Sequence, residues 1–241
     1  MLGLPIAIRA CLFDLDGVLT QTAKEHAAAW KEMFDEFLAK RGQPLFDIVA
    51  DYDAYIDGRL RADGTRAFLA SRHISLPEGT PDDSANEDTV NGLSNRKNAI
   101  LLKRLRTHGV EVYPGSVQYL HAVRAAGLKV AVVSASANTH EVLAAAGLSN
   151  EFDTVIDGIV AQREHLNGKP APDTYLAAAR AVHEEPSYSA VFEDALAGVE
   201  AGRAGDFGFV VGVDRVGQRD ALLQHGASVV VDDLSELLDK P

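Results

Sequence analysis

Residues Ala10–Thr20 read ACLFDLDGVLT, and this stretch decides the fold. Its apolar start, 10–13, predicts a short strand that is buried on both faces. Asp14 and Asp16 follow that strand directly, and Gly17 comes next. Side chains two residues apart in an extended chain point the same way, so we expect the two carboxylates to share one crevice. Taken alone, the pair is also explained by an Asp-rich turn or a helix N-cap.

The second half of the chain alternates between apolar, β-branched runs and helical patterns. The predicted strands are Lys129–Val133, Ala190–Phe192, Phe207–Val213 and Ser228–Val231. The predicted helices between them are Ser116–Ala126, Thr139–Ala146, Asp173–His183 and Ala195–Ala204, several of them closed by a glycine. Continuous apolar strands separated by helices indicate a parallel sheet that is covered on both faces. We therefore predict an α/β fold with a doubly wound (Rossmann-like) parallel-sheet core.

The segment from Thr22 to Gly109 has a different pattern. Apolar residues recur at helical spacing along its first part, and the predicted helices are Thr22–Lys40, Asp51–Leu60, Thr65–Arg72 and Asn91–Arg106. The run Leu76–Ser84 is rich in Pro, Gly and Asp and predicts a loop. We therefore expect a helical cap domain, residues 22–110, inserted into an α/β core made of residues 1–21 and 111–241.

The composition is ordinary for a globular protein and limits the classes of partner. Hydrophobic residues make up 46% of the 241 residues, charged residues 24%, and the net charge is −12. Acidic proteins are disfavoured as partners of nucleic acids and anionic membranes, because both bind basic surfaces. The single cysteine, Cys11, lies in an apolar run and is expected to pack in the core. We expect a cytoplasmic monomer that acts on a small molecule.

Three further polar segments accompany the predicted strands. The run 134–136 (Ser-Ala-Ser) offers hydroxyls and helix-start amides to an anion, Lys169 lies beside two prolines, and the pair 193–194 (Glu-Asp) follows a strand. Each also has an ordinary reading: an N-cap pair, a solvated loop lysine and a charged helix cap. Because all of them and the first aspartate pair fall at carboxyl ends of predicted strands, one shared site explains them together.

The order Asp-x-Asp-Gly, Ser, Lys-Pro, Glu-Asp resembles the four-motif pattern of the haloacid dehalogenase superfamily of phosphotransferases. The resemblance covers nearly the whole chain. Within the superfamily the chain is most similar to the β-phosphoglucomutase-like subfamily and its sugar-phosphatase relatives. The segments that carry this closer likeness are His26–Trp30, Arg96–Asn98, Val112–Gly115, Ser134–Asn138 and Lys169–Asp173.

This resemblance implies Mg²⁺-dependent phosphoryl transfer through a phosphorylated aspartate. Asp14 is the implied nucleophile, and Asp16 the implied general acid and base. Ser134 and Lys169 would hold the oxygens of the transferring phosphoryl group. The implied Mg²⁺ ligands are hard oxygen donors from Asp14, Asp16 (its backbone oxygen) and Asp194, with Glu193 acting directly or through water.

The resemblance also implies residues that contact a sugar phosphate: Thr22, His26, Gly58, Arg59, Arg61, Lys97, Ala135, Ser136 and Asn138. Arg61 resembles the family's arginine for the far phosphate of a sugar bisphosphate, although plain surface charge explains it equally well. Two positions depart from the pattern. Gln21 stands where an aspartate is usual, which bears on the hinge, and Ala137 stands where the mutases carry a lysine, which weakens the expected grip on a distal phosphate.

The leading functional hypothesis is interconversion of β-glucose 1-phosphate and glucose 6-phosphate through the 1,6-bisphosphate. The alternative is a phosphatase for sugar phosphates or phosphoglycolate, because both reactions use the same phospho-aspartate. They differ in whether a sugar hydroxyl or water receives the phosphoryl group. A third alternative, a non-catalytic binding module, is expected to lack Asp14, Asp16 or Lys169, and all three are present.

Overall fold

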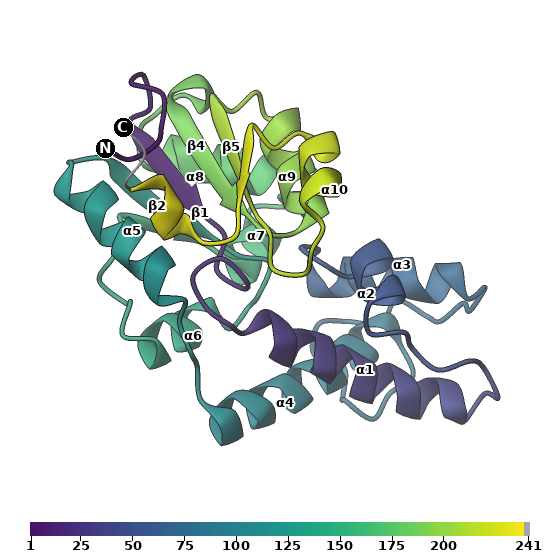
Figure 1. Ribbon diagram of the computed structural model, residues 1–241. Coiled ribbons are helices and arrows are strands. Elements are labelled where there is room, and N and C mark those ends of the chain that lie inside the picture. The colour runs from purple at the N-terminus through teal and green to yellow at the C-terminus, as the bar shows by residue number, and fades with distance from the viewer. Residues whose placement is uncertain (239–241) are drawn as a thin grey trace. The chain divides into compact units, whose positions relative to one another are not determined.

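The computed structural model describes residues 1–238, which fall into two compact units. One unit takes Met1–Gln21 and the chain from Glu111 onward, and the other is Thr22–Val110. Figure 1 labels the helices and strands of both. Each unit has a hydrophobic core of its own, as expected of separate domains.

The first unit is built on a parallel sheet, which has six strands within residues 1–238. Across the sheet the order is β3 (Thr154–Ile156), β2 (Lys129–Val133), β1 (Ala10–Phe13), β4 (Ser189–Glu193), β5 (Phe209–Val213) and β6 (Val229–Val231). The chain runs from β1 out to β3 and then returns to β4, on the other side of β1. This reversal places a topological switch point between β1 and β4, where doubly wound sheets bind ligands. The predicted doubly wound α/β core is confirmed.

Helices cover both faces of this sheet (Figure 1). On one face the apolar side chains of the strands share a core with α8 (Asp173–Ala181), α9 (Leu196–Ala204) and α10 (Arg219–His225). On the other face Tyr119 of α5 (Pro114–Ala125) packs against Phe13 and Phe192, whose rings stack at 4.4 Å. Burial on both faces explains why the strands have no alternation of polar and apolar residues.

The remaining elements of this unit are short. They are α6 (Thr139–Ala145), α7 (Gly158–Arg163) and the 3-10 turns η1 (Pro186–Tyr188) and η2 (Leu234–Leu237). The sequence analysis missed β3, whose three residues lie between Asp153 and Asp157. Such a short run shows no period, and both aspartates bond to the backbone: Asp153 accepts from the Val130 amide, and Asp157 caps α7.

The two segments that connect the first unit to the rest of the chain are paired with each other. Thr20 and Val112 form an isolated antiparallel bridge. The Gln21 amide donates to the Glu111 carbonyl at 2.8 Å, and the Gln21 side-chain amide donates to the Val112 carbonyl at 3.3 Å. An aspartate at position 21 has no N–H on its side chain, so this last bond depends on the departure from the family pattern.

The second unit consists of α1 (Ala23–Ala39), α2 (Ala50–Tyr55), α3 (Arg61–Ser71) and α4 (Val90–His108), joined by loops. Aromatic rings form the centre of its core: Phe34 lies 5.4 Å from Trp30 and 4.1 Å from Phe68. The helix predicted over Asp51–Leu60 is too long, because Gly58 adopts a left-handed φ of 71° that no helix continues. The run Leu76–Ser84 forms neither helix nor strand, as predicted.

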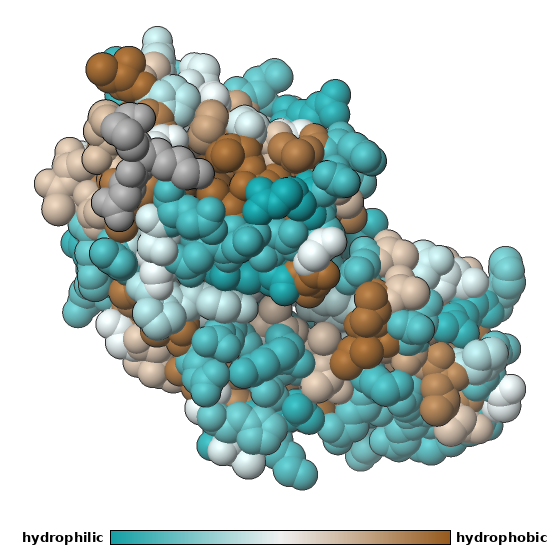
Figure 2. Space-filling model, in the orientation of Figure 1, coloured by the Kyte–Doolittle hydropathy of each residue, from teal (hydrophilic) through white to brown (hydrophobic). Residues whose placement is uncertain are grey.

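The face of the molecule shown in Figure 2 is mainly hydrophilic, with smaller apolar areas between the polar side chains. Among the helices of residues 1–238, none combines the length and the apolar character that crossing a membrane requires.

Candidate active site

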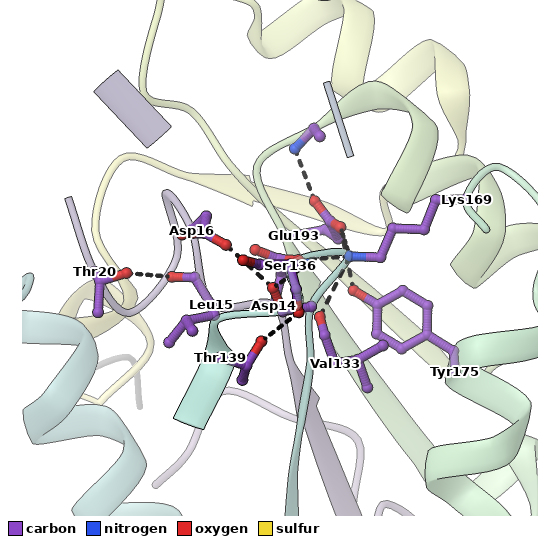
Figure 3. A network of polar contacts seen from close by, with 12 residues as sticks. Asp14, Leu15, Asp16, Thr20, Val133, Ser136, Thr139, Lys169, Tyr175 and Glu193 are labelled. Carbon is purple, nitrogen blue, oxygen red and sulfur yellow. Dashed lines mark hydrogen bonds and ion pairs between the residues drawn. The ribbon is translucent and has the colours of Figure 1, made fainter. Parts of the chain in front are cut away.

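The strand ends bring the predicted acidic and hydroxyl side chains together (Figure 3). Asp14 directly follows β1, and its amide donates to the Phe192 carbonyl at 2.9 Å, which extends the pairing of β1 with β4. Glu193 is the last residue of β4. Ser134 directly follows β2, and its amide donates to the Ile156 carbonyl of β3 at 3.0 Å. Backbone pairing therefore fixes the Cα positions of Asp14, Glu193 and Ser134 at the ends of their strands.

Lys169 reaches the centre of this group from the loop before α8. Its Nζ donates to Asp14 Oδ1 at 2.5 Å, forms an ion pair with Glu193 Oε1, and lies 3.4 Å from the Val133 carbonyl oxygen. The ammonium also lies 4.9 Å from the centre of the Tyr175 ring. Lys169 is therefore a buried member of the site, and the alternative of a solvated loop lysine is wrong.

The charges in this buried group shift one another's pKa values. Burial lowers the pKa of Lys169, but the Asp14 and Glu193 carboxylates outweigh burial and hold it well above its ordinary value. Burial raises the pKa of Asp14; Lys169 opposes that rise, and Glu193 and Asp16 add to it. One buried cation thus contacts two carboxylates, and a third, Asp16, acts on Asp14. Additional positive charge would favour the ionised form of Asp14 that a nucleophile needs.

Glu193 is fully buried, and both of its carboxylate oxygens have partners. Oε1 accepts from Lys169 and, at 3.3 Å, from the Tyr175 hydroxyl, while Oε2 accepts from the Ala195 amide at 2.8 Å. A Cβ on Gly198 would lie only 1.8 Å from Oε1, so a larger residue at that position would displace the Glu193 carboxylate. These contacts orient Glu193 toward Lys169.

Asp16 belongs to a tight turn beside Ser134. The Ser134 hydroxyl donates to Asp16 Oδ2 at 3.1 Å and accepts from the Ser136 amide at 3.1 Å. The turn closes through the Gly17 amide, which donates to the Thr20 carbonyl at 2.7 Å. Gly17 has a φ of 99°, a left-handed conformation that favours glycine.

The donor set at the strand ends fits Mg²⁺. Mg²⁺ is held in proteins by one or two carboxylates, with waters and substrate phosphate completing its octahedron. The Asp194 carboxylate lies against Gly17, since a Cβ there would be 1.8 Å from Asp194 Oδ2. This places Asp194 beside the peptide that carries the Asp16 carbonyl. Within residues 1–238 no group of three or more His, Cys, Asp or Glu side chains is arranged to hold a metal.

The loop between β2 and α6 carries the other predicted residues of the first unit, Ala135, Ser136 and Asn138. The Ser136 hydroxyl accepts from the Asn138 amide at 3.1 Å, and Ser136 and Asn138 are both buried. Thr139 donates from its hydroxyl to the Ser136 carbonyl at 2.9 Å. The hydrogen bonds within the loop hold its amides and hydroxyls in one conformation next to Ser134.

The remaining predicted residues lie in the helical unit: Thr22, His26, Gly58, Arg59, Arg61 and Lys97. His26 Nδ1 and Lys97 Nζ are 3.2 Å apart, and the Lys97 ammonium lies 5.0 Å from the centre of the Trp30 ring. Arg61 is the first residue of α3; burial lowers its pKa, and in the part of the chain that the structure describes it forms no ion pair.

Two residues at the site escaped the sequence analysis. Tyr175 contacts Glu193 and Lys169, but in sequence it is one apolar position of a predicted helix. Arg215 donates to the Gly17 carbonyl at 2.7 Å. A signal for Arg215 was present, because it closely follows the predicted strand Phe207–Val213 and so falls at the same edge of the sheet.

Comparison with known proteins gives consistent results. The model of the haloacid dehalogenase-like hydrolase family matches residues 8–206. The β-phosphoglucomutases of Mycobacterium bovis and Mycobacterium tuberculosis are each 55% identical to this chain, over 99% of it and 94% of theirs. The β-phosphoglucomutase of Bacillus subtilis is 30% identical over 95% of this chain and 92% of its own. The crystal structure of β-phosphoglucomutase from Clostridium difficile is similar, with a TM-score of 0.76, 27% identity and coverage of 95% of this chain and 93% of that one.

Proposed function

The chain belongs to the haloacid dehalogenase-like hydrolase family, in its β-phosphoglucomutase-like branch, and on that premise we propose that it is a Mg²⁺-dependent β-phosphoglucomutase. The family resemblance predicted from the motifs is confirmed. The observation that carries the proposed chemistry is the buried Lys169 between Asp14 and Glu193 at the switch point of the sheet. The near full-length similarity to β-phosphoglucomutases supports the sugar phosphate as substrate.

In the proposed reaction Asp14 carries the phosphoryl group between two sugar molecules. An Asp14 carboxylate oxygen bonds to the 1-phosphorus of glucose 1,6-bisphosphate, the bond from phosphorus to the sugar oxygen breaks, and Asp16 gives its proton to that oxygen. Glucose 6-phosphate leaves. The 6-hydroxyl of β-glucose 1-phosphate then gives its proton to Asp16 and takes the phosphoryl group from Asp14, which restores the bisphosphate.

The other residues of the first unit would hold and neutralise the phosphoryl group. Lys169 supplies a fixed positive charge beside Asp14, and the Ser134 hydroxyl lies next to Asp16. Asp14, the Asp16 carbonyl and Asp194 would hold Mg²⁺, whose charge offsets the repulsion between carboxylate and phosphate. The amides and hydroxyls of Ala135, Ser136 and Asn138 are proposed to bind phosphate oxygens at the start of α6.

The sequence analysis left two roles open for Glu193, a direct metal ligand or one that acts through water, and we propose the second. Each hydrogen bond uses one lone pair of a carboxylate oxygen and so lowers its availability to a metal ion. Both oxygens of Glu193 already accept hydrogen bonds, from Lys169 and Tyr175 on one side and Ala195 on the other. We therefore propose that Glu193 orients Lys169 and keeps it protonated, and that Glu193 influences the metal only through water.

The helical unit is proposed to supply contacts to the rest of the sugar phosphate. Arg61 is the strongest candidate there, because it is a half-buried cation that forms no ion pair within residues 1–238. Lys97 and His26 are a second candidate pair: their nitrogens lie 3.2 Å apart, and the Lys97 ammonium lies over the Trp30 ring. Thr22, Gly58 and Arg59 remain substrate contacts predicted from the family resemblance.

The test is a coupled assay with two readouts. Purified protein with Mg²⁺, β-glucose 1-phosphate and a trace of glucose 1,6-bisphosphate is followed for glucose 6-phosphate and for free phosphate, with Asp14→Asn as the blank. Glucose 6-phosphate that rises with little free phosphate supports the mutase. Free phosphate as the main product makes the protein a phosphatase and overturns the proposal. No product in either channel also overturns the proposed substrate.

A further inference from the structure

Arg215 lies two residues beyond β5 and joins several segments of the first unit. Its Nε donates to the Gly17 carbonyl at 2.7 Å, and its Nη1 donates to the Asp232 carbonyl at 2.8 Å. Its guanidinium also stacks on the Tyr113 ring, 3.5 Å from the ring centre. Only 14% of the side chain is exposed. These contacts fix the orientation of the planar guanidinium. They also restrain the two carbonyls and the ring that it contacts.

Two of the partners are successive carbonyls of the turn that follows the nucleophile. Besides Gly17, the Val18 carbonyl lies 3.4 Å from Nη2 of Arg215. The Leu15 carbonyl accepts from amides inside the turn, whereas Arg215 is the donor that the structure shows for the Gly17 and Val18 carbonyls. Gly17 has no side chain to limit its backbone and adopts a φ of 99°. Arg215 therefore adds an external restraint to the internal bond from the Gly17 amide to the Thr20 carbonyl.

The same turn carries donors that the proposed function assigns to Mg²⁺. The Asp16 carbonyl belongs to the peptide unit that immediately precedes Gly17, and the Asp194 carboxylate lies against the Gly17 Cα. The Asp16 and Gly17 carbonyls belong to the two peptide planes that meet at the Gly17 Cα, so freeing the Gly17 carbonyl also loosens the torsions that set the Asp16 carbonyl. Loss of the hydrogen bond to the Gly17 carbonyl would let the Asp16 carbonyl move from its present position. The Asp194 carboxylate, which lies against Gly17, would move as well.

We propose that Arg215 is a positioning residue for the divalent cation, which acts by holding the turn 16–18 in the conformation that binds the metal. The inference rests on the proposed function, because it takes the Asp16 carbonyl and Asp194 as metal donors. Arg215 itself contacts neither the metal nor the substrate in this proposal. Residues that orient metal donors in this way typically contribute ten- to hundredfold to metal affinity.

The experiment measures cation binding directly, without substrate. Mn²⁺, which EPR detects in its free form, is titrated into the wild-type protein and into Arg215→Gln, and Mg²⁺ is then added as a competitor. The matched control is Arg219→Gln. Arg219 is a neighbouring arginine that contacts the Val230 carbonyl and the Asp232 side chain but not the turn. We expect a Kd roughly 10- to 100-fold higher for Arg215→Gln and an unchanged Kd for Arg219→Gln.

A purely structural role is excluded by two further readouts. Circular dichroism tells whether Arg215→Gln is folded, and excess Mg²⁺ should restore its turnover of sugar phosphate while KM for the sugar stays unchanged. Arg215→Lys keeps the charge but lacks the planar fork, and serves if the glutamine variant does not fold; its affinity should also fall.

Three results would overturn the inference. They are equal Kd values for wild type and the folded Arg215 variants, equal losses in the Arg215 and Arg219 variants, and lost turnover that Mg²⁺ does not restore. A wild-type protein that binds no Mn²⁺ would instead remove the metal from the proposed function, and the inference with it.

Discussion

The Lys169 ammonium lies 2.5 Å from Asp14 Oδ1, and both side chains are almost completely buried. The pair joins two distant parts of the chain, since Asp14 follows the first strand and Lys169 precedes α8. Glu193 shares the same ammonium. One cation thus holds two buried carboxylates that would otherwise repel each other, so its removal affects the fold as well as the chemistry.

Replacing Lys169 with methionine should therefore destabilise the first unit strongly. Breaking a buried charge pair by removing one partner typically lowers the free energy of unfolding by about 3–5 kcal/mol. Urea unfolding without Mg²⁺ measures this. The matched control is Lys40→Met, whose ion pair with Glu36 is exposed (62% and 57%) and should contribute less than about 1 kcal/mol. Similar losses in the two variants would show that the buried pair has no special weight.

Gly17→Ala should strongly lower the proposed activity. A Cβ at position 17 would lie 1.8 Å from Asp194 Oδ2, so the carboxylate must leave its place. Gly127→Ala is the control: Gly127 also has a left-handed φ, of 81°, but nothing lies within 4 Å of its Cβ position. Both variants carry the backbone strain of about 1–2 kcal/mol, seen as a lower unfolding midpoint.

Only the variant at position 17 should lose activity, by about 10- to 100-fold, the range typical when contacts that orient metal donors are changed. Turnover of β-glucose 1-phosphate measured for both variants provides the check. Full activity in Gly17→Ala would mean that Asp194 does not need its present position.

The core of the fold is predictable from the sequence because burial on both faces removes polar residues from the strands. β1 and β2 begin and end where their apolar runs do. β3 was missed because three residues between two aspartates carry no period. The helix expected over 51–60 was too long because the left-handed conformation of Gly58 is not visible in a helical pattern.

The sequence predicts which residues of the site lie at the ends of strands, but not which side chains contact one another. Adjacent parallel strands end at one edge, so Asp14, Ser134 and Glu193 had to lie near one another. Their partners depend on side-chain reach across elements, which the sequence does not encode in any spacing. For that reason Tyr175 and Arg215 were missed, and the contacts of Glu193 with Lys169, Tyr175 and Ala195 were not predicted.

Glu25 should make the helical unit less stable in acid. Burial alone would raise its pKa, but side-chain hydrogen bonds with His108 and Arg104, at 3.1 Å and 2.8 Å, outweigh burial and lower the pKa from its ordinary value of about 4.5. The unfolded chain then binds the proton more tightly than the folded one, so stability rises with pH. Its contribution is complete above the ordinary pKa and disappears as the pH falls through the lowered one.

Thermal unfolding of Glu25→Gln across a pH series tests this. The variant should melt below wild type at pH 7, by about 2–4 °C for each kcal/mol lost, and the two should converge toward about pH 3. Glu36→Gln is the control, because the exposed pair of Glu36 with Lys40 gives a smaller difference. A gap between wild type and Glu25→Gln that stays constant with pH would indicate lost packing instead of lost charge.

Gln21 should stabilise the pairing of the two connecting segments without taking part in the chemistry. Its side-chain amide donates to the Val112 carbonyl, next to backbone bonds from the Gln21 amide to Glu111 and from the Tyr113 amide to Leu19. Gln21→Glu keeps the shape but replaces the donor with an acceptor that faces a carbonyl, so about 1 kcal/mol or more should be lost locally. Hydrogen exchange of the Gln21 and Tyr113 amides should therefore become about fivefold faster or more, because exchange reports local opening. The exposed Gln224→Glu controls for the added charge. Unchanged exchange in Gln21→Glu would mean that the backbone bonds alone hold the pairing, and that the departure from aspartate at this position has no effect on the connection.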